Sequence, residues 1–174
     1  EVNGTHNRTD YDLGRHQEYS KTSQEYLDPE TNEKFIPYII ESTVGCDRTV
    51  LAVLDNAYCE EVLENGETRE VMRFTPYLAP YKLAVLPLNK KYHGEKAKEL
   101  FDKFNKVFMT TYDETASIGK RYRRQDAIGT PFAITVDDET LNNGTVTLRD
   151  RDTMEQIVLK IEEVEAYVTE RIKF

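Results

Sequence analysis

Hydrophobic and polar positions follow two different periods along the chain, and the second half carries the clearer signals. Residues 81–88, "YKLAVLPL", form a nearly continuous apolar run, which is typical of a strand buried on both faces. Residues 93–107 are polar except for apolar residues at the spacing of one helix face. These residues are Ala97, Leu100, Phe101 and Phe104. The pattern predicts a buried strand followed by an amphipathic helix.

The rest of this half alternates in the same way. Short apolar runs predict further strands at residues 107–114, 130–138, 145–152 and 154–161. Helical spacing predicts helices at residues 116–129 and 162–174, with a turn at Asn143–Gly144. The resulting order, β-α-β-α-β-β-β-α, predicts an α/β domain of two or three layers. We expect a mixed sheet of five strands with about three helices.

The first half has weaker signals. A turn at residues 28–30 precedes a predicted strand at residues 34–41, and residues 45–62 then predict a helix with one apolar face. Residues 60–71 are polar with Asn65–Gly66 as a turn, so we expect an exposed loop or hairpin tip. Pro76 and Pro80 follow where the composition changes, and they indicate a boundary near residues 73–80.

Composition and charge narrow the function. The 174 residues carry a net charge of −9, which argues against non-specific nucleic-acid binding but leaves room for a local basic patch. No run of apolar residues is long enough to span a membrane. Cys46 and Cys59 form no CxxC motif, so we expect a reduced, cytoplasmic protein. The chain opens in mid-pattern on Glu1, and we expect it to be a piece of a longer protein.

One predicted strand alternates arginine and aspartate. In "TVTLRDRD", residues 145–152, Arg149 and Arg151 share one face with two threonines, and Asp150 and Asp152 share the other. On an open face, arginine suits the N3 and O2 acceptors of an unpaired cytosine, and aspartate suits its amino group. A ladder of ion pairs between neighbouring strands explains the same pattern without a ligand.

The most basic segment is "GKRYRRQDAIG", residues 119–129. Four cations surround a single tyrosine within it, namely Lys120, Arg121, Arg123 and Arg124. One interpretation is a contact surface for a phosphate backbone. The other is a solvated helix face whose cations pair with neighbouring carboxylates.

A third candidate site is "IESTVGCDRT", residues 40–49. The predicted strand ends near Glu41, a glycine turn follows, and a helix begins near Asp47. Arg48 in the first turn of that helix could face a phosphate, and Glu41 could bind an ammonium group. An ordinary strand-to-helix turn with a surface arginine explains the segment equally well.

Taken together, these stretches closely resemble the C-terminal part of bacterial-type glycyl-tRNA synthetase. The resemblance is carried by "NRTDYDL", "DPETNEKFIPYIIESTVGCDRTVLAVLDNAY", "LAPYKLAVLPL", "SIGKRYRRQDAIGTPFAITVD" and "TVTLRDRDTMEQI". It implies that residues 1–72 are the end of a class II catalytic domain, with its last antiparallel strands and motif 3 helix. Residues 73–79 would be a connection, and residues 80–174 an anticodon-binding domain.

The resemblance also implies residue roles in glycine activation. Arg48 matches the motif 3 arginine that contacts ATP. Glu41 matches the family's glutamate for the ammonium of glycine, with the Thr43 hydroxyl beside it. Glu1 falls where the family carries an acidic residue near ATP and magnesium, and Arg8 lines the same region. The implied catalytic residues are Arg48 and Glu1, and no metal ligand is assigned.

For the RNA, the resemblance implies that the basic helix and the arginine–aspartate strand meet the anticodon of tRNA-Gly. The expected contacts are Lys120, Arg121, Arg123, Arg124, Arg149, Asp150, Arg151 and Asp152. Glycine codons begin with GG, so the anticodon ends in two cytosines. The parent enzyme would join glycine to tRNA through glycyl-adenylate as a homodimer.

The sequence departs from the family in places. Ser42-Thr43 replaces the commoner Pro-Ser, Thr5 and His6 replace apolar residues, and Asp47 replaces a second glycine of motif 3. Motifs 1 and 2 of class II enzymes are absent, so we expect this chain alone to form no glycyl-adenylate. The alternative is a non-catalytic, anticodon-binding-like interaction module, such as an accessory subunit. The retained Glu41 and Arg48 argue against that alternative.

Overall fold

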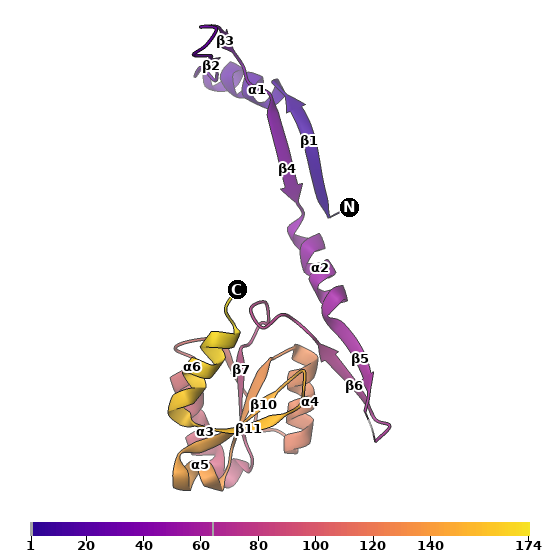
Figure 1. Ribbon diagram of the computed structural model, residues 1–174, viewed down its shortest axis with the longest axis vertical. Helices are drawn as coiled ribbons and strands as arrows, with labels where there is room; N and C mark the ends of the chain where they lie inside the picture. Colours follow the sequence, from indigo (N-terminus) through magenta and orange to yellow (C-terminus); the bar gives the residue numbers. More distant parts are fainter. Residues whose placement is uncertain (1, 64) are drawn as a thin grey trace. The chain divides into compact units, whose positions relative to one another are not determined.

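The computed structural model describes residues 2–63 and 65–174, and it divides into two compact units, Glu1–Ala52 and Val53–Phe174. The second unit contains the larger sheet (Figure 1), whose strand order is β11-β10-β9-β7-β8. Its strands are β7 (Leu83–Pro87), β8 (Thr110–Tyr112), β9 (Phe132–Val136), β10 (Thr145–Asp150) and β11 (Gln156–Lys160).

The directions of these strands confirm the predicted mixed sheet of five strands. β7 is parallel to both of its neighbours, β8 and β9, whereas β10 runs antiparallel to β9 and β11. The parallel strands need crossover connections, and α3 (Lys90–Phe104) and α4 (Ile118–Ile128) follow β7 and β8 along the chain. β10 and β11 are joined by the short turn that contains Asp152.

Residues 80–174 contain one helix more than expected. α6 (Ile161–Arg171) follows β11 as predicted, but a short helix, α5 (Asp138–Asn143), occupies the segment expected to be a turn. Asp137 caps α5 by accepting a hydrogen bond from the Thr140 amide at 3.1 Å. Gly144 ends the helix with φ +68°, a backbone conformation that glycine adopts without strain.

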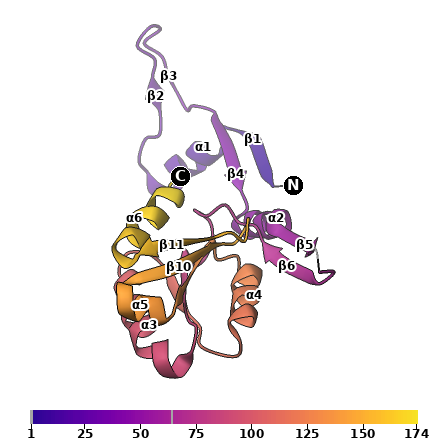
Figure 2. The ribbon, with the colours of Figure 1, turned by 60° about the horizontal axis from the view of Figure 1, so that its bottom comes forward.

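The sheet separates two layers of helices. Alternate side chains of β7, β9 and β10, such as Val85, Ile134 and Leu148, pack in the main core with residues of α3 and α6. The opposite face carries the smaller Ala84 and Ala133, against which α4 packs. Figures 1 and 2 show α4 on one side of the sheet and the other three helices on the opposite side.

The end of α4 makes a close approach to the chain before β7. Gly129 lies at φ +87°, and a Cβ atom there would stand 2.5 Å from a ring carbon of Phe74 and 2.8 Å from the Met72 carbonyl oxygen. Only glycine permits both the conformation and this approach. The glycine therefore fixes residues 72–74 against the end of α4.

The segment before β7 differs from its prediction. α2 (Cys46–Ala57) ends at Ala57 rather than near residue 62, because the chain then enters the hairpin of β5 (Tyr58–Val62) and β6 (Thr68–Met72). The predicted turn at Asn65–Gly66 is at the tip of this hairpin, with Gly66 at φ +80°. The expectation of an exposed segment is wrong for β6, since Arg69 and Val71 are buried.

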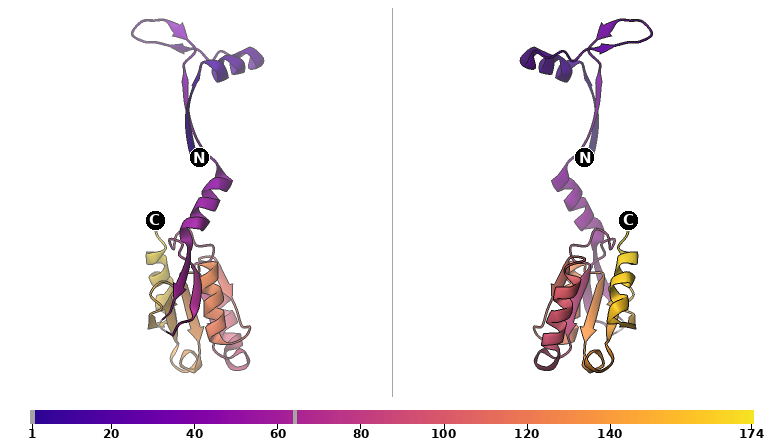
Figure 3. Two further views of the ribbon diagram at one scale, coloured as in Figure 1. Left: turned by 90° about the vertical axis from the view of Figure 1, so that its right-hand side faces the viewer. Right: turned by 90° about the vertical axis from the view of Figure 1, so that its left-hand side faces the viewer.

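The first unit is built on the antiparallel ribbon of β1 (Asn3–Thr9) and β4 (Ile39–Val44), which twists visibly in Figure 3. α1 (Tyr11–Ser20) and the small hairpin of β2 (Tyr26–Leu27) and β3 (Lys34–Phe35) lie between these strands in sequence. The single strand predicted at residues 34–41 is therefore divided, and Pro37, which cannot donate a ladder hydrogen bond, lies in the gap. Among residues 2–52 as described, none is buried.

Candidate nucleic-acid interface

A pocket of about 450 Å³ lies beside α4 in the second unit, a size within the range of small-ligand sites. Its walls come from the hairpin, from the start of α4, from β10 and from the turn after β10. The lining residues are Glu67, Ser117, Gly119, Lys120, Tyr122, Arg123, Arg149 and Met154. The structure thus brings together three of the predicted RNA contacts, Lys120, Arg123 and Arg149.

Arg149 is held rigidly at this pocket. Its side chain is only 7% exposed, and its Nη1 and Nη2 atoms donate to Asp126 at 2.8 and 3.2 Å. Its guanidinium carbon also lies 4.9 Å from the centroid of the Tyr122 ring. A guanidinium held on two sides keeps its remaining N–H groups in one orientation.

The expectation that Arg149 and Arg151 line an open strand face is wrong. α4 and the hairpin cover that face, and both side chains are buried. The ladder of ion pairs between strands is also wrong, because the strand neighbours of Arg149 are Ala133 and Gln156. Its charged partner, Asp126, comes from α4 instead.

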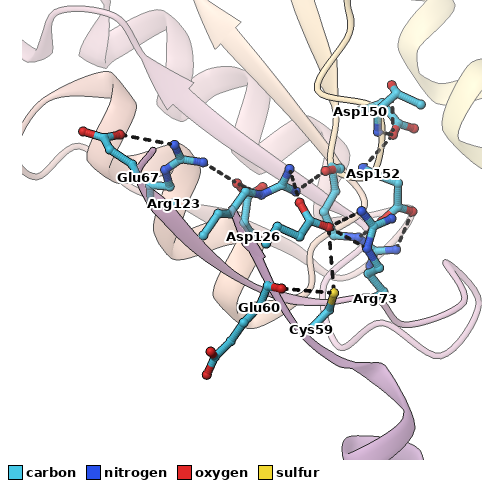
Figure 4. A network of polar contacts seen from close by, with 12 residues as sticks. Cys59, Glu60, Glu67, Arg73, Arg123, Asp126, Asp150 and Asp152 are labelled. Carbon is cyan, nitrogen blue, oxygen red and sulfur yellow. Dashed lines mark hydrogen bonds and ion pairs between the residues drawn. The ribbon is translucent and has the colours of Figure 1, made fainter. Parts of the chain in front are cut away.

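Asp126 is the centre of a buried ionic cluster (Figure 4). It is 1% exposed, and besides Arg149 it faces Arg69 Nε at 3.1 Å and Arg123 Nη1 at 3.9 Å. Arg69 comes from β6 and is fully buried, and this burial lowers its pKa. Arg69 also faces Glu61 at 3.4 Å, so the cluster joins the hairpin to α4 and β10.

Arg151 joins its own turn to two other segments and does not line the pocket. Its guanidinium donates to the carbonyl oxygens of Gly129 at 2.9 Å and Phe74 at 2.8 Å. It also donates to the Asp152 carboxylate, which in turn lies 3.3 Å from Arg73 Nη1. Every side-chain nitrogen of Arg151 therefore donates a hydrogen bond to an acceptor within the protein.

The two aspartates of this stretch shape the turn after β10. Asp150 Oδ1 accepts hydrogen bonds from the amides of Asp152 at 2.8 Å and Thr153 at 3.0 Å. The turn places Met154 at φ +60°, and Met154 lines the pocket. The carboxylates predicted to read bases thus organise the backbone that brings Met154 to the site.

Two cations of the basic helix face the pocket. Lys120 is exposed and has no ion pair with any residue that the structure describes. Arg123 lies 3.9 Å from both Glu67 and Asp126, a separation too long for a hydrogen bond. Both cations are therefore available to an anionic ligand.

The other two cations of the helix, Arg121 and Arg124, contact the protein itself and not the pocket. Arg121 is buried and donates to the backbone carbonyls of Pro87, Glu114, Thr115 and Ala116. Arg124 Nε donates to Asp113 at 2.8 Å. Burial acts to raise the pKa of Asp113, but hydrogen bonds from Thr115 and Arg124 outweigh it, and the net shift is downward.

Most of this unit matches a known protein family. The family described as "Anticodon binding domain" matches residues 82–171. The chain belongs to the anticodon-binding domain family. Its match includes α4 and β10, which supply most of the pocket, and excludes the hairpin of β5 and β6.

Similarity to characterised proteins extends beyond the family match. The chain is 55% identical over 173 residues to a glycine–tRNA ligase of Clostridium acetobutylicum, covering 99% of this chain and 37% of that protein. It is 57% identical over 174 residues to the glycine–tRNA ligase of Geobacillus kaustophilus, covering 38% of that protein. The predicted resemblance to glycyl-tRNA synthetase is confirmed, and the chain spans little more than a third of these curated relatives.

A solved structure supports the fold. The crystal structure of the RNA-binding domain of threonyl-tRNA synthetase from Cryptosporidium parvum Iowa II superposes with a TM-score of 0.65. The two share 20% sequence identity, and the match covers 84% of this chain and 34% of that chain. At this identity the likeness concerns the architecture alone.

Several pocket residues of this anticodon-binding family member were absent from the sequence-based prediction. Glu67 lies at the hairpin tip, where no hydrophobic period marks it, and Met154, predicted to begin a strand, lies in the loop before β11. Ser117 precedes α4 and Gly119 lies in its first turn, but neither residue type suggests a binding role by itself. Tyr122 was visible as the aromatic residue among the cations, and its contact with Arg149 was not.

The first unit places part of the predicted glycine site. Arg8 Nε lies 3.4 Å from Glu41 on the neighbouring strand, and Arg8 also donates two hydrogen bonds of 2.8 Å to Asp12. The bonds to Asp12 raise the pKa of Arg8. Thr43 shares the face of Glu41 on β4. Arg48 is exposed in the first turn of α2, and Glu1 lies outside the described residues.

Residues 2–63 and 65–174 hold no group of three or more His, Cys, Asp or Glu side chains placed to bind a metal ion. Over the same residues, no helix has the length and apolar character needed to cross a membrane.

Proposed function

We propose that this chain is the tRNA-recognising part of a glycine–tRNA ligase, and that residues 53–174 bind the anticodon stem-loop of tRNA-Gly. The identity of 55% over 99% of the chain carries this proposal. The pocket with Lys120, Arg123 and Arg149 adds a surface suited to RNA. The accessory-module alternative has no comparable support, because the similar proteins are named as ligases.

Binding would use two kinds of contact. Lys120 and Arg123 face the phosphates, where their charge attracts the strand without reading it, and Arg124 supports the helix through Asp113. Arg149 donates from a fixed position to the N3 and O2 acceptors of an unstacked cytosine. The buried Arg121 and Arg151, with Asp150 and Asp152, contribute by holding the backbone around the pocket.

The remaining roles belong to the whole ligase, which would use ATP, magnesium and glycine as a cytoplasmic homodimer. Glu41 would accept the glycine ammonium, and Thr43 would stand beside it. Arg48 would face ATP, with Arg8 and Glu1 near the same site. Without a motif 2 arginine, the chain alone would give no steady ATP–pyrophosphate exchange, and measuring such exchange would disprove this.

The test is fluorescence anisotropy of a labelled tRNA-Gly anticodon stem-loop with the chain, at low and moderate salt. The control loop has both anticodon cytosines changed to guanines. We expect the cytosine loop to bind more tightly, and Arg149→Ala to remove the preference. Equal binding of both loops, fading steeply with salt, would limit the chain to phosphate contacts and contradict base reading.

A further inference from the structure

The tip of the β5–β6 hairpin contributes an acidic side chain to a pocket that is otherwise basic. Glu67 is the residue just before β6, and its side chain is 69% exposed. Its Oε2 atom lies 3.9 Å from Arg123 Nη2, across the pocket from the hairpin (Figure 4). At that distance the carboxylate keeps its acceptor positions free for a ligand.

The hairpin holds Glu67 in a defined position. The Glu67 carbonyl accepts a hydrogen bond of 2.9 Å from the Leu63 amide, and its own amide donates to Asn65 Oδ1 at 3.0 Å. Two residues further on, Arg69 is fully buried in the ionic cluster around Asp126. The tip is therefore anchored to α4 within two residues of the exposed carboxylate.

A second pocket supports a binding role for the hairpin. This pocket, of about 580 Å³, is lined by Glu61, Val62, Leu63, Asn65 and Met154. Met154 also lines the first pocket, so the two pockets are neighbours that share this residue. Residues of the hairpin line both pockets, although the hairpin lies outside the family match at residues 82–171.

A carboxylate facing guanidinium groups discriminates between the two pyrimidines. Cytosine presents an amino donor beside the N3 and O2 acceptors, so a carboxylate can accept from the amino group while an arginine donates to the acceptors. Uracil presents the O4 acceptor in place of the amino group. Oxygen lone pairs would then face the carboxylate, and the base would be rejected.

We propose that Glu67 is a specificity-determining residue, which accepts a hydrogen bond from the amino group of an unstacked anticodon cytosine and excludes uracil. The inference rests on the proposed function and assigns the base-reading acceptor to the hairpin rather than to Asp150 or Asp152. Those two aspartates are already engaged by backbone amides and by Arg151 and Arg73.

The experiment compares stem-loops in which one anticodon cytosine at a time is changed to uracil, using the full 174-residue chain. Anisotropy gives the ratio of affinities for the cytosine and uracil loops with wild-type protein, Glu67→Gln and Glu70→Gln. Glu70 is the matched control, because it is an exposed glutamate of the same hairpin that does not line the pocket.

We expect Glu67→Gln to reduce the preference for cytosine over uracil about tenfold at one of the two positions. The amide can donate to O4 as readily as it accepts from the amino group. Glu70→Gln should keep the wild-type ratio. Both variants lose one negative charge, so a uniform gain in affinity for all loops would appear in both and would not alter the ratio.

Two other outcomes distinguish failure of the role assigned to Glu67 from failure of the proposed function. If the wild-type chain prefers the cytosine loop and Glu67→Gln keeps the same ratio as Glu70→Gln, the role of Glu67 is overturned and the proposed function stands. If the wild-type chain binds no loop, or binds cytosine and guanine loops equally, the proposed function fails and this inference fails with it.

Discussion

The two units of this chain differ in how their functional residues are supported. In Val53–Phe174, Arg149 is fixed by Asp126 and Tyr122 above a packed core. In Glu1–Ala52, Glu41 and Arg8 face each other on a two-stranded ribbon, and none of residues 2–52 is buried. A short sequence motif thus indicates which chemistry a segment could support, but the packing beneath it determines the geometry.

The difference is also visible in the apolar residues. The second unit buries the large side chains of Phe104, Leu100 and Ile134 completely or nearly so. The first unit leaves Ile40, Val44 and other apolar residues of its ribbon exposed. We therefore expect the second unit to dominate the cooperative unfolding of the chain.

The largest expected effect comes from making the same substitution in both units. Phe104→Ala should lower the free energy of unfolding by about 3–5 kcal/mol, because it removes a fully buried ring from the main core. Phe35→Ala, at a residue 48% exposed, should change it by less than about 0.5 kcal/mol. Urea denaturation followed by circular dichroism measures the free energy of unfolding of both variants. Equal losses would contradict the expected difference in stability between the two units.

The next effect concerns the ionic cluster. Asp126→Asn should cost about 3 kcal/mol, because it leaves Arg69 and Arg149 buried without their shared counter-charge. Asp102→Asn, on the exposed surface of α3, is the matched control and should be nearly neutral. If the two variants unfold at the same urea concentration, the cluster does not hold the hairpin, α4 and β10 together.

A smaller effect separates the free cations from the structural ones. Lys120→Ala should weaken binding of every stem-loop several-fold and make the salt dependence shallower, as expected for one lost phosphate contact. Lys106→Ala, an exposed lysine after α3, should change neither. Anisotropy titrations over a series of salt concentrations give both quantities. A loss for Lys120→Ala that depends on the anticodon sequence would mean base contact instead.

The smallest effect is a pH dependence of the free energy of unfolding, which arises from Asp113 and its contact with Arg124 of α4. The pKa of Asp113 is lowered in the folded protein, so its ionised form stabilises the fold above the ordinary value of 3.8, and this contribution is lost as the pH falls below that value. Asp113→Asn should therefore cost about 1 kcal/mol at pH 7, and the difference from wild type should shrink below pH 3.8. Urea midpoints between pH 7 and pH 3 test this, and a constant difference would contradict it.

Much of the second unit could be predicted from the sequence, because its strands and helices have clear apolar periods. β7 and α3 lie close to their predicted positions, since both bury the residues that the pattern marks. α5 was missed because its six residues are too few for a helical period. α2 was predicted too long because Tyr58–Val62 continues the apolar pattern while pairing with β6.

The site was harder to predict than the fold. Lys120 and Arg123 could be identified from local charge, but the burial of Arg69, Arg121 and Arg151 depends on carbonyls and carboxylates distant in sequence. Glu67 reaches the pocket only because Arg69 anchors the hairpin on α4. No spacing within the chain encodes that contact.

Hydrogen exchange of the chain, alone and saturated with the tRNA-Gly anticodon stem-loop, tests the central claim most directly. It reports both units in one experiment. We predict added protection in the hairpin tip, in residues 117–123 and around Arg149 and Met154, and unchanged exchange in residues 2–52. Protection centred on residues 40–49, with no change around the pocket, would contradict the account.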